Sequence, residues 1–236
     1  MKKTILTYLV IFCFAITTHA QNPYGPKNSK KNILSAIGVA GGITYGKQIW
    51  DPEGPLATEK YRLRVNGAVL AEFFHHPIYR WRTELEYNLM GTTEHLDAPA
   101  NTNVVNKTNY ISFNNYLKVN FKETGFIPYF LIGPRLEYLL IKKPEVYAPV
   151  IQHFSALHVT GAIGIGAEAV WDKPIRPFIE AFYNHDIMPS YSSYYADGLT
   201  PTNIVYHAYE LRIGLKYFFE GTKKDVCPKV INPAGN

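Results

Sequence analysis

Much of the chain consists of segments in which apolar and polar residues alternate with period two. The clearest segment is 79–91. Its odd positions carry Tyr79, Trp81, Thr83, Leu85, Tyr87 and Leu89, and its even positions carry Arg80, Arg82, Glu84, Glu86 and Asn88. Because successive side chains of a strand point to opposite faces, this pattern predicts a strand with one face for hydrocarbon and one that pairs charges.

The same alternation recurs along the chain and predicts an all-β fold. We expect eight strands, at residues 33–45, 61–74, 79–91, 110–121, 127–140, 158–170, 176–185 and 206–219. The connections 75–78, 122–125 and 171–174 are short, and the connections 46–60, 92–109, 141–157 and 187–205 are long. Short turns at one rim and long loops at the other are typical of outer-membrane barrels, whose short turns face the periplasm. Residues 33–219 are therefore predicted to form an eight-stranded antiparallel up-and-down transmembrane β-barrel.

Residue size indicates which face of this barrel points inward. The polar face also carries the small residues Ala36, Gly38, Ala40, Gly42, Ala162, Gly164 and Gly166. A narrow eight-stranded bore needs small side chains and has little room for the bulky residues of the other face. Aromatic residues such as Tyr45, Trp81 and Trp171 near strand ends predict interfacial girdles. The alternative is a soluble secreted ligand-binding barrel with the two faces reversed.

The inward face of the predicted barrel carries charges of both signs. These residues are Arg62, Arg64, Glu72, Arg80, Arg82, Glu84, Glu86, Lys118, Arg135, Glu137, Glu168, Glu180, Glu210, Arg212 and Lys216. Acids and bases nearly balance, and buried charge persists when it is paired. Because eight strands enclose a bore that side chains can fill, we predict a salt-bridged plug and no general diffusion channel.

The two ends of the chain predict export. Lys2 and Lys3 precede an apolar run that ends at Ala20, so residues 1–20 have the pattern of a secretory signal peptide. Residues 21–32 form a polar, turn-rich lead-in. The tail, residues 220–236, is either a disordered periplasmic extension or a peptide that docks on a periplasmic or secretion-system protein.

Composition excludes several classes of function. The formal net charge of +5 falls to +3 when residues 1–20, which hold two lysines, are removed. This charge is too small to predict a nucleic-acid partner. Cys227 is then the remaining cysteine, which excludes a disulfide framework and a cysteine metal site. No later segment approaches the roughly 18 apolar residues of a membrane helix.

The later segments also resemble a known family. The resemblance is carried by residues 110–121, by Ile127-Pro128-Tyr129-Phe130-Leu131-Ile132-Gly133-Pro134, and by residues 161–168, 180–183 and 211–218. They resemble the outer-membrane β-barrel domain of Bacteroidota that is often labelled PorT-like. The resemblance implies an outer-membrane barrel without a catalytic signature, and some relatives are tied to the type IX secretion system. This chain departs from the family pattern by continuing beyond Phe219.

Two clusters are candidates for chemistry. A lipid-modifying barrel enzyme similar to lipid A deacylases would need a histidine within reach of a serine and an acid. The residues that offer this set are Glu180, His185, Asp186, Ser190, Ser192 and Ser193. His75 and His76 are adjacent in a predicted turn and lack the spacing of a closed metal site. We therefore predict no catalytic, cofactor or metal site and a non-enzymatic protein.

The long loops provide a candidate recognition surface. Tyr147, Tyr191, Tyr194 and Tyr195 lie in the last two long loops. Tyrosines on loops of a rigid scaffold provide contact area for recognition, although they can equally pack as a cap over the lumen. We expect a monomeric barrel in the outer membrane whose partners are membrane lipid and a periplasmic or secretion-system protein. Its role would be structural, adhesive or associated with secretion.

Overall fold

The computed structural model describes residues 33–51, 57–96, 102–121, 125–143, 154–170, 173–189, 191–192 and 203–219. All of them belong to one compact unit, Asn32–Asn236. The predicted signal peptide, the lead-in to residue 32 and the tail from residue 220 lie outside the described residues. Within the described part of the chain, no helix is long and apolar enough to cross a membrane.

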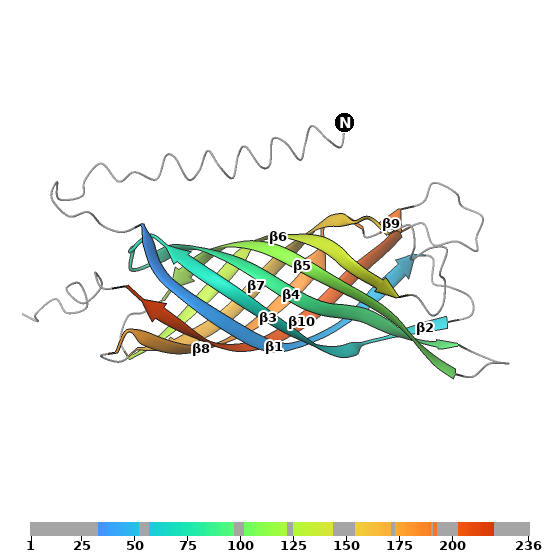
Figure 1. The fold of residues 1–236 in the computed structure, drawn as a ribbon, viewed down its shortest axis with the longest axis horizontal. Helices are drawn as coiled ribbons and strands as arrows, with labels where there is room; N and C mark the ends of the chain where they lie inside the picture. The colour runs from blue at the N-terminus through green and yellow to red at the C-terminus, as the bar shows by residue number, and fades with distance from the viewer. Residues whose placement is uncertain are drawn as a thin grey trace, which may run out of the picture. The chain divides into compact units, whose positions relative to one another are not determined.

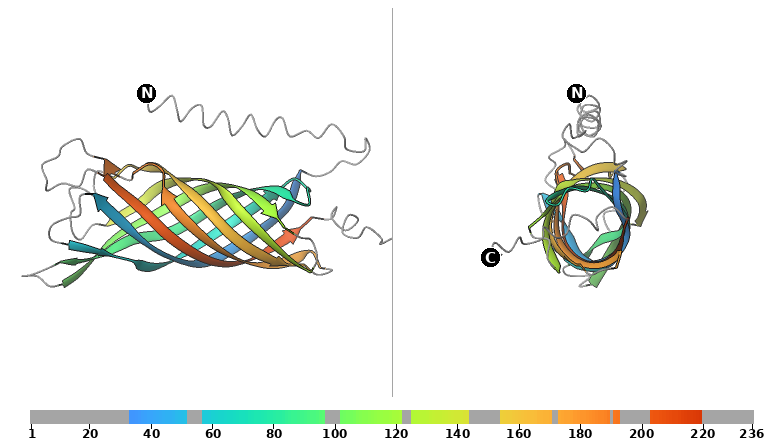
Figure 2. Two further views of the ribbon diagram at one scale, coloured as in Figure 1. Left: turned by 180° about the vertical axis from the view of Figure 1, so that it is seen from behind. Right: turned by 90° about the vertical axis from the view of Figure 1, so that its left-hand side faces the viewer.

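The described residues form a closed antiparallel barrel of eight long strands (Figures 1 and 2). The strands are β1 (Leu34–Asp51), β3 (Arg62–Phe73), β4 (Tyr79–Leu96), β5 (Thr102–Asn120), β6 (Phe126–Lys143), β7 (Leu157–Ala169), β8 (Ile175–Asp186) and β10 (Asn203–Phe218). Each long strand pairs with the next, and β1 pairs with β10 from Ala36↔Phe218 to Asp51↔Asn203. The predicted eight-stranded barrel is confirmed.

The two ends of the barrel differ in their connections. Residues 74–78, 121–125 and 170–174 connect strands at one end, here called the turn end. The other connections lie at the opposite end, here called the loop end, where β2 (Ala57–Lys60) pairs with β4 and β9 (Tyr191–Ser192) pairs with β10. Residues 144–156 and 187–202 are long connections, whereas residues 97–101 join β4 to β5 by a connection as short as those of the turn end. The up-and-down order is as predicted, but the predicted long connection between β4 and β5 is wrong.

Several strands run further toward the loop end than predicted. β1 continues to Asp51, β4 continues to Leu96, and β5 begins at Thr102. The predicted loops 46–60 and 92–109 are therefore wrong for much of their length. Residues 92–95 are Thr, Thr, Glu and His, so no apolar face is present there to give the alternation on which the prediction depended.

Charged side chains lie inside the barrel and bulky apolar side chains lie outside. Arg82 and Glu86 are fully buried, whereas Val39 and Ile213 are 56% and 66% exposed. This arrangement is the reverse of the one that a soluble barrel requires. The side chains inside the barrel are therefore the ones that meet across its axis.

The β1–β10 seam depends on the small residues of β1. A Cβ atom placed on Gly42 would lie 2.8 Å from Cα and 2.9 Å from Cγ of Arg212. On the outward-facing Gly41, the nearest atom to such a Cβ is the Asn66 carbonyl oxygen, at 3.8 Å. Close backbone approach therefore requires glycine at position 42 but not at position 41.

We predict that Gly42→Val prevents normal closure of the barrel, because the added atoms collide with β10. Refolding in detergent followed by unheated and heated gel migration measures the compact fraction, which should fall strongly. Gly41→Val is the matched control and should refold like the wild type. Equal compact fractions for the two variants would contradict the close approach at this seam.

Candidate functional site in the barrel interior

The interior charges form three layers along the barrel. The layer nearest the turn end consists of Glu72, Glu168, Arg80, Lys118, Arg176 and Lys216. Lys118 Nζ lies 3.1 Å from Glu72 Oε1 and 2.8 Å from Glu168 Oε2. Lys216 Nζ lies 2.9 Å from the same Glu72 oxygen and also pairs with Glu168. Two carboxylates are therefore shared by four cations.

Aromatic rings contact the cations of this turn-end layer. Lys118 Nζ lies 4.2 Å from the centroid of the Tyr129 ring, and Arg176 Cζ lies 4.0 Å from that of Phe218. Lys216 Nζ lies 5.0 Å from the centroid of the Phe178 ring. The negative face of an aromatic ring attracts a cation, so these rings partly offset the excess positive charge.

The middle layer consists of Arg82, Arg212, Glu84 and Glu180. Arg212 binds Glu84 at 2.9 Å and Glu180 at 3.1 Å. Arg82 lies 2.5 Å from Glu84 and donates two hydrogen bonds to Glu180. The Tyr129 hydroxyl also donates to Glu180, at 2.5 Å. Each arginine contacts both carboxylates, so this layer is electrically neutral.

The layer nearest the loop end is acidic. Arg135 lies 3.2 Å from Glu86, 3.2 Å from Glu137 and 2.9 Å from Glu210. His158 Nε2 lies 3.0 Å from Glu137 Oε2 and 4.0 Å from Asp186 Oδ1. Four carboxylates therefore share Arg135 and His158, and Glu86 also lies 3.5 Å from Arg212 of the middle layer.

The interior charge changes sign along the barrel. Cations outnumber carboxylates in the turn-end layer, the two are equal in the middle layer, and carboxylates outnumber cations in the loop-end layer, beyond which Arg62 and Arg64 of β3 add two positive charges. Among the described residues, the interior ion pairs join seven lysines and arginines to eight carboxylates, with His158 as a further base. The interior is thus nearly neutral as a whole and polar along its length.

Buried apolar side chains lie at the loop end beside the acidic layer. The cluster consists of Met90, Tyr110, Leu139, Phe154, Ile204, Tyr206 and Ala208. The Tyr110 and His158 rings pack nearly perpendicular to each other, with ring centroids 4.9 Å apart. This apolar cluster and the three charged layers together line the barrel interior from the loop end to the turn end.

The three layers contain every predicted inward charge except Arg62 and Arg64, which are half-buried on β3 nearer the loop end. They also contain Arg176, His158 and Asp186, which the sequence analysis did not place in the lumen. Arg176 and Asp186 are separated from Glu180 by even numbers of residues on β8. That spacing alone was enough to predict that they share its face.

The described members of the candidate hydrolase set do not lie together. Glu180 points into the lumen, whereas His185, five residues later on the same strand, faces outward and packs on His207 with ring centroids 4.2 Å apart. Asp186 faces inward again and accepts a hydrogen bond from Thr160 at 3.0 Å. Ser190 and Ser193 lie outside the described residues, as does the side chain of Ser192. His185 and the two acids therefore lie on opposite sides of the barrel wall.

Two groups of possible metal ligands form hydrogen bonds or ion pairs with other groups of the protein. Ligand atoms of Glu137, His158 and Asp186 lie within 4.8 Å of one another. Glu137 pairs with Arg135 as well as with His158, and the backbone N–H of Tyr206 donates to Asp186 at 2.9 Å. These contacts explain why the three side chains lie close together: they form a hydrogen-bonded cluster.

The histidines of the first short turn also have a local role. His76 Nδ1 accepts hydrogen bonds from the backbone N–H groups of Ile78, at 3.2 Å, and Tyr79, at 3.1 Å. His76 therefore shapes the turn that leads into β4. Of the predicted loop tyrosines, Tyr147, Tyr194 and Tyr195 lie outside the described residues, and Tyr191 is described only by its backbone in β9.

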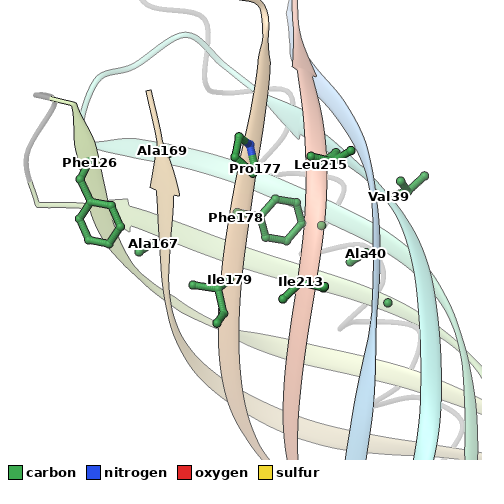
Figure 3. A pocket seen from close by; sticks show the side chains of 12 residues that line it. Val39, Ala40, Phe126, Ala167, Ala169, Pro177, Phe178, Ile179, Ile213 and Leu215 are labelled. Atoms are coloured by element: carbon green, nitrogen blue, oxygen red, sulfur yellow. The ribbon is translucent and has the colours of Figure 1, made fainter. Parts of the chain in front are cut away.

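The described outer surface of the barrel includes shallow grooves, of which two are well defined. One, of about 740 Å³, is lined by side chains that include Phe126, Ile179, Ile213 and Leu215 (Figure 3). The other, of about 650 Å³, is lined largely by apolar residues of β1, β3, β4 and β10. Both grooves have mainly apolar linings, and the lining of the second also includes Glu84 and Lys216 of the charged layers.

Neither a protein-family model nor a curated protein matches this chain. Solved structures similar to it include neisserial surface protein A, with 12% identity, TM-score 0.46, and coverage of 78% of this chain and 99% of that one. Ail of Yersinia pestis has 10% identity and TM-score 0.39, with coverage of 78% and 99%. The N-terminal barrel domain of Pseudomonas aeruginosa OprF has 11% identity and TM-score 0.37, with coverage of 76% and 97%. The PorT-like resemblance stays a prediction.

We predict that Glu180→Gln destabilises the barrel by about 3–5 kcal/mol, because it leaves Arg82 and Arg212 short of one buried counter-charge. Denaturant unfolding in detergent micelles measures the change. The double variant Glu180→Gln with Arg82→Gln restores the charge balance and is the control. Its loss of stability should be smaller than the sum of the two single losses. Additive losses would contradict the pairing.

Proposed function

We propose that this protein is an outer-membrane β-barrel with a closed interior and a structural, adhesive or secretion-associated role. The observation that carries the proposal is the combination of an apolar outer surface with an ion-paired interior. Such a surface is stable in hydrocarbon, and such an interior leaves no evident path for solutes. The two halves of this proposal are supported by different side chains.

The outer surface supports insertion in a membrane. Among the described outward-facing side chains between the turn end and the tyrosines Tyr45, Tyr183 and Tyr209, none is charged. On β10 this apolar face runs from Tyr217 to Tyr209, which is about 27 Å of strand at ~3.4 Å per residue. At a tilt of about 40° the face is roughly 21 Å tall, near the ≈ 25 Å band of outer-membrane barrels. Exposed apolar area of this extent is rare on soluble proteins.

Two polar side chains that face outward on this surface form a hydrogen bond with each other. Thr83 on β4 and Asn115 on β5 face outward directly opposite each other. The Thr83 hydroxyl donates a hydrogen bond to the Asn115 side-chain oxygen at 3.0 Å. Unsatisfied polar groups are costly in hydrocarbon, so this pairing fits a membrane location.

The interior supports a closed barrel. Arg82, Arg135, Arg212, Lys118 and Lys216 are among the largest fully buried side chains. An eight-stranded barrel has room for its own side chains and little more. The protein therefore acts through its surfaces and loops and not as a diffusion channel.

A non-enzymatic role is the simpler proposal. The histidine and the acids of the candidate hydrolase set lie on opposite sides of the wall. The strands rise beyond the apolar belt at the loop end, where β4 and β5 pair as far as Leu96↔Thr102. In the orientation typical of such barrels this end faces outside the cell, where it would display the loops to a partner.

We expect the full chain to be recovered from the outer-membrane fraction of the cells that make it, because its apolar surface is unstable in water. Unheated samples should migrate faster than heated samples in detergent gels, since the folded barrel stays compact. The prediction is tested by fractionation combined with this gel assay. Recovery in the soluble periplasmic fraction would contradict the proposed function.

A further inference from the structure

The outward surface changes character in a fixed order at the loop end. Going toward the loop end along the outer face of β1, β8 and β10, apolar residues give way to a tyrosine. A basic residue lies two positions beyond that tyrosine. The tyrosines are Tyr45, Tyr183 and Tyr209, and the basic residues are Lys47, His185 and His207. In the barrel the three strands are neighbours in the order β1, β10, β8. The basic side chains therefore form a row, here called the basic row.

The basic row has a defined geometry. Lys47 lies opposite His207, and His207 lies opposite His185. The Tyr183 hydroxyl lies 2.9 Å from His207 Nδ1, which fixes the orientation of that ring. Lys47 Nζ lies 5.4 Å from the centroid of the Tyr61 ring, and Tyr61 stacks on Tyr45. Tyrosine side chains thus contact both Lys47 and His207 of the row.

The described part of the barrel wall carries no acidic side chain beside this row. None of the described outward-facing side chains of β1, β8 and β10 is acidic. Elsewhere on the same rim, the exposed Lys107 and Lys143 lie directly opposite each other on β5 and β6. Like charges directly opposite each other destabilise a sheet. The basic surface of this rim therefore favours an anion from outside the chain.

The position of the row indicates which anion is available. Tyrosines of membrane proteins gather at the boundary between hydrocarbon and headgroups. Side chains two residues beyond the tyrosines then lie at the depth of lipid phosphates. Lysine and histidine N–H groups are suitable donors to phosphate oxygens.

We propose that Lys47, His185 and His207 bind the phosphorylated headgroup of a membrane lipid whose acyl chains lie on the apolar belt. This inference rests on the proposed membrane location and adds a specific lipid class to it. The tyrosines beneath the row contact the boundary region of the same lipid. The rim then anchors the barrel at a fixed depth in its leaflet.

The test uses the full chain refolded into nanodiscs of phosphatidylcholine with a minor fraction of lipid A, a phosphorylated glycolipid. Native mass spectrometry measures how strongly lipid A is enriched among the lipids that stay bound. Lys47→Gln should lower the enrichment about fivefold, the usual effect of one positive charge near an anionic lipid surface. The triple variant with His185→Gln and His207→Gln should lower it further, whereas Lys47→Arg should retain it.

Lys173→Gln is the matched control, because Lys173 is exposed at the turn end, and it should leave the enrichment unchanged. Equal enrichment in the wild type and the triple variant overturns the lipid site while leaving the membrane location intact. A chain that does not insert in nanodiscs overturns the proposed function and this inference together. Displacement of lipid A by inorganic phosphate at equal concentration would also overturn the lipid site, since the basic row would then bind free anions.

Discussion

The mutual neutralisation of buried charges inside the barrel is the constraint on which the rest of the structure depends. An unpaired charge in this interior costs several kcal/mol, so each inward-facing charge requires a partner at a matching depth. The partners often lie on strands that are not neighbours in the sheet. Arg212 of β10 reaches Glu84 of β4, and Arg135 of β6 reaches Glu210 of β10. These pairs join opposite walls and fix how the sheet closes.

Other features of the molecule follow from these paired charges in the interior. Glycines on β1, such as Gly42, leave room for the long side chains of β10. Aromatic rings such as Tyr129 occupy the space between the charged layers and contact their cations. Closure satisfies the backbone hydrogen bonds of the strands, which is what allows strands to cross a membrane. The outward face is then free to be apolar, because strand periodicity separates it from the interior.

The sequence was sufficient to predict the barrel, its strand order and the facing of most charged residues, since period-two alternation is a local property. It was not sufficient to predict the layers. Arg82 and Glu180 are 98 residues apart, and their meeting depends on the stagger of the closed sheet. The strand extension to Leu96 was missed because both of its faces are polar. The separation of His185 from Glu180 was available from spacing alone, and the candidate hydrolase cluster overlooked it.

The central claim is that ion-paired side chains close the bore. Single-channel recording of the refolded full chain in planar bilayers tests it most directly, with a channel-forming barrel in the same preparation as the positive reference. We predict successful insertion, shown by recovery of folded protein from the bilayer lipid, without stable conductance steps. Reproducible, long-lived, ohmic conductance steps from the unmodified protein would contradict it.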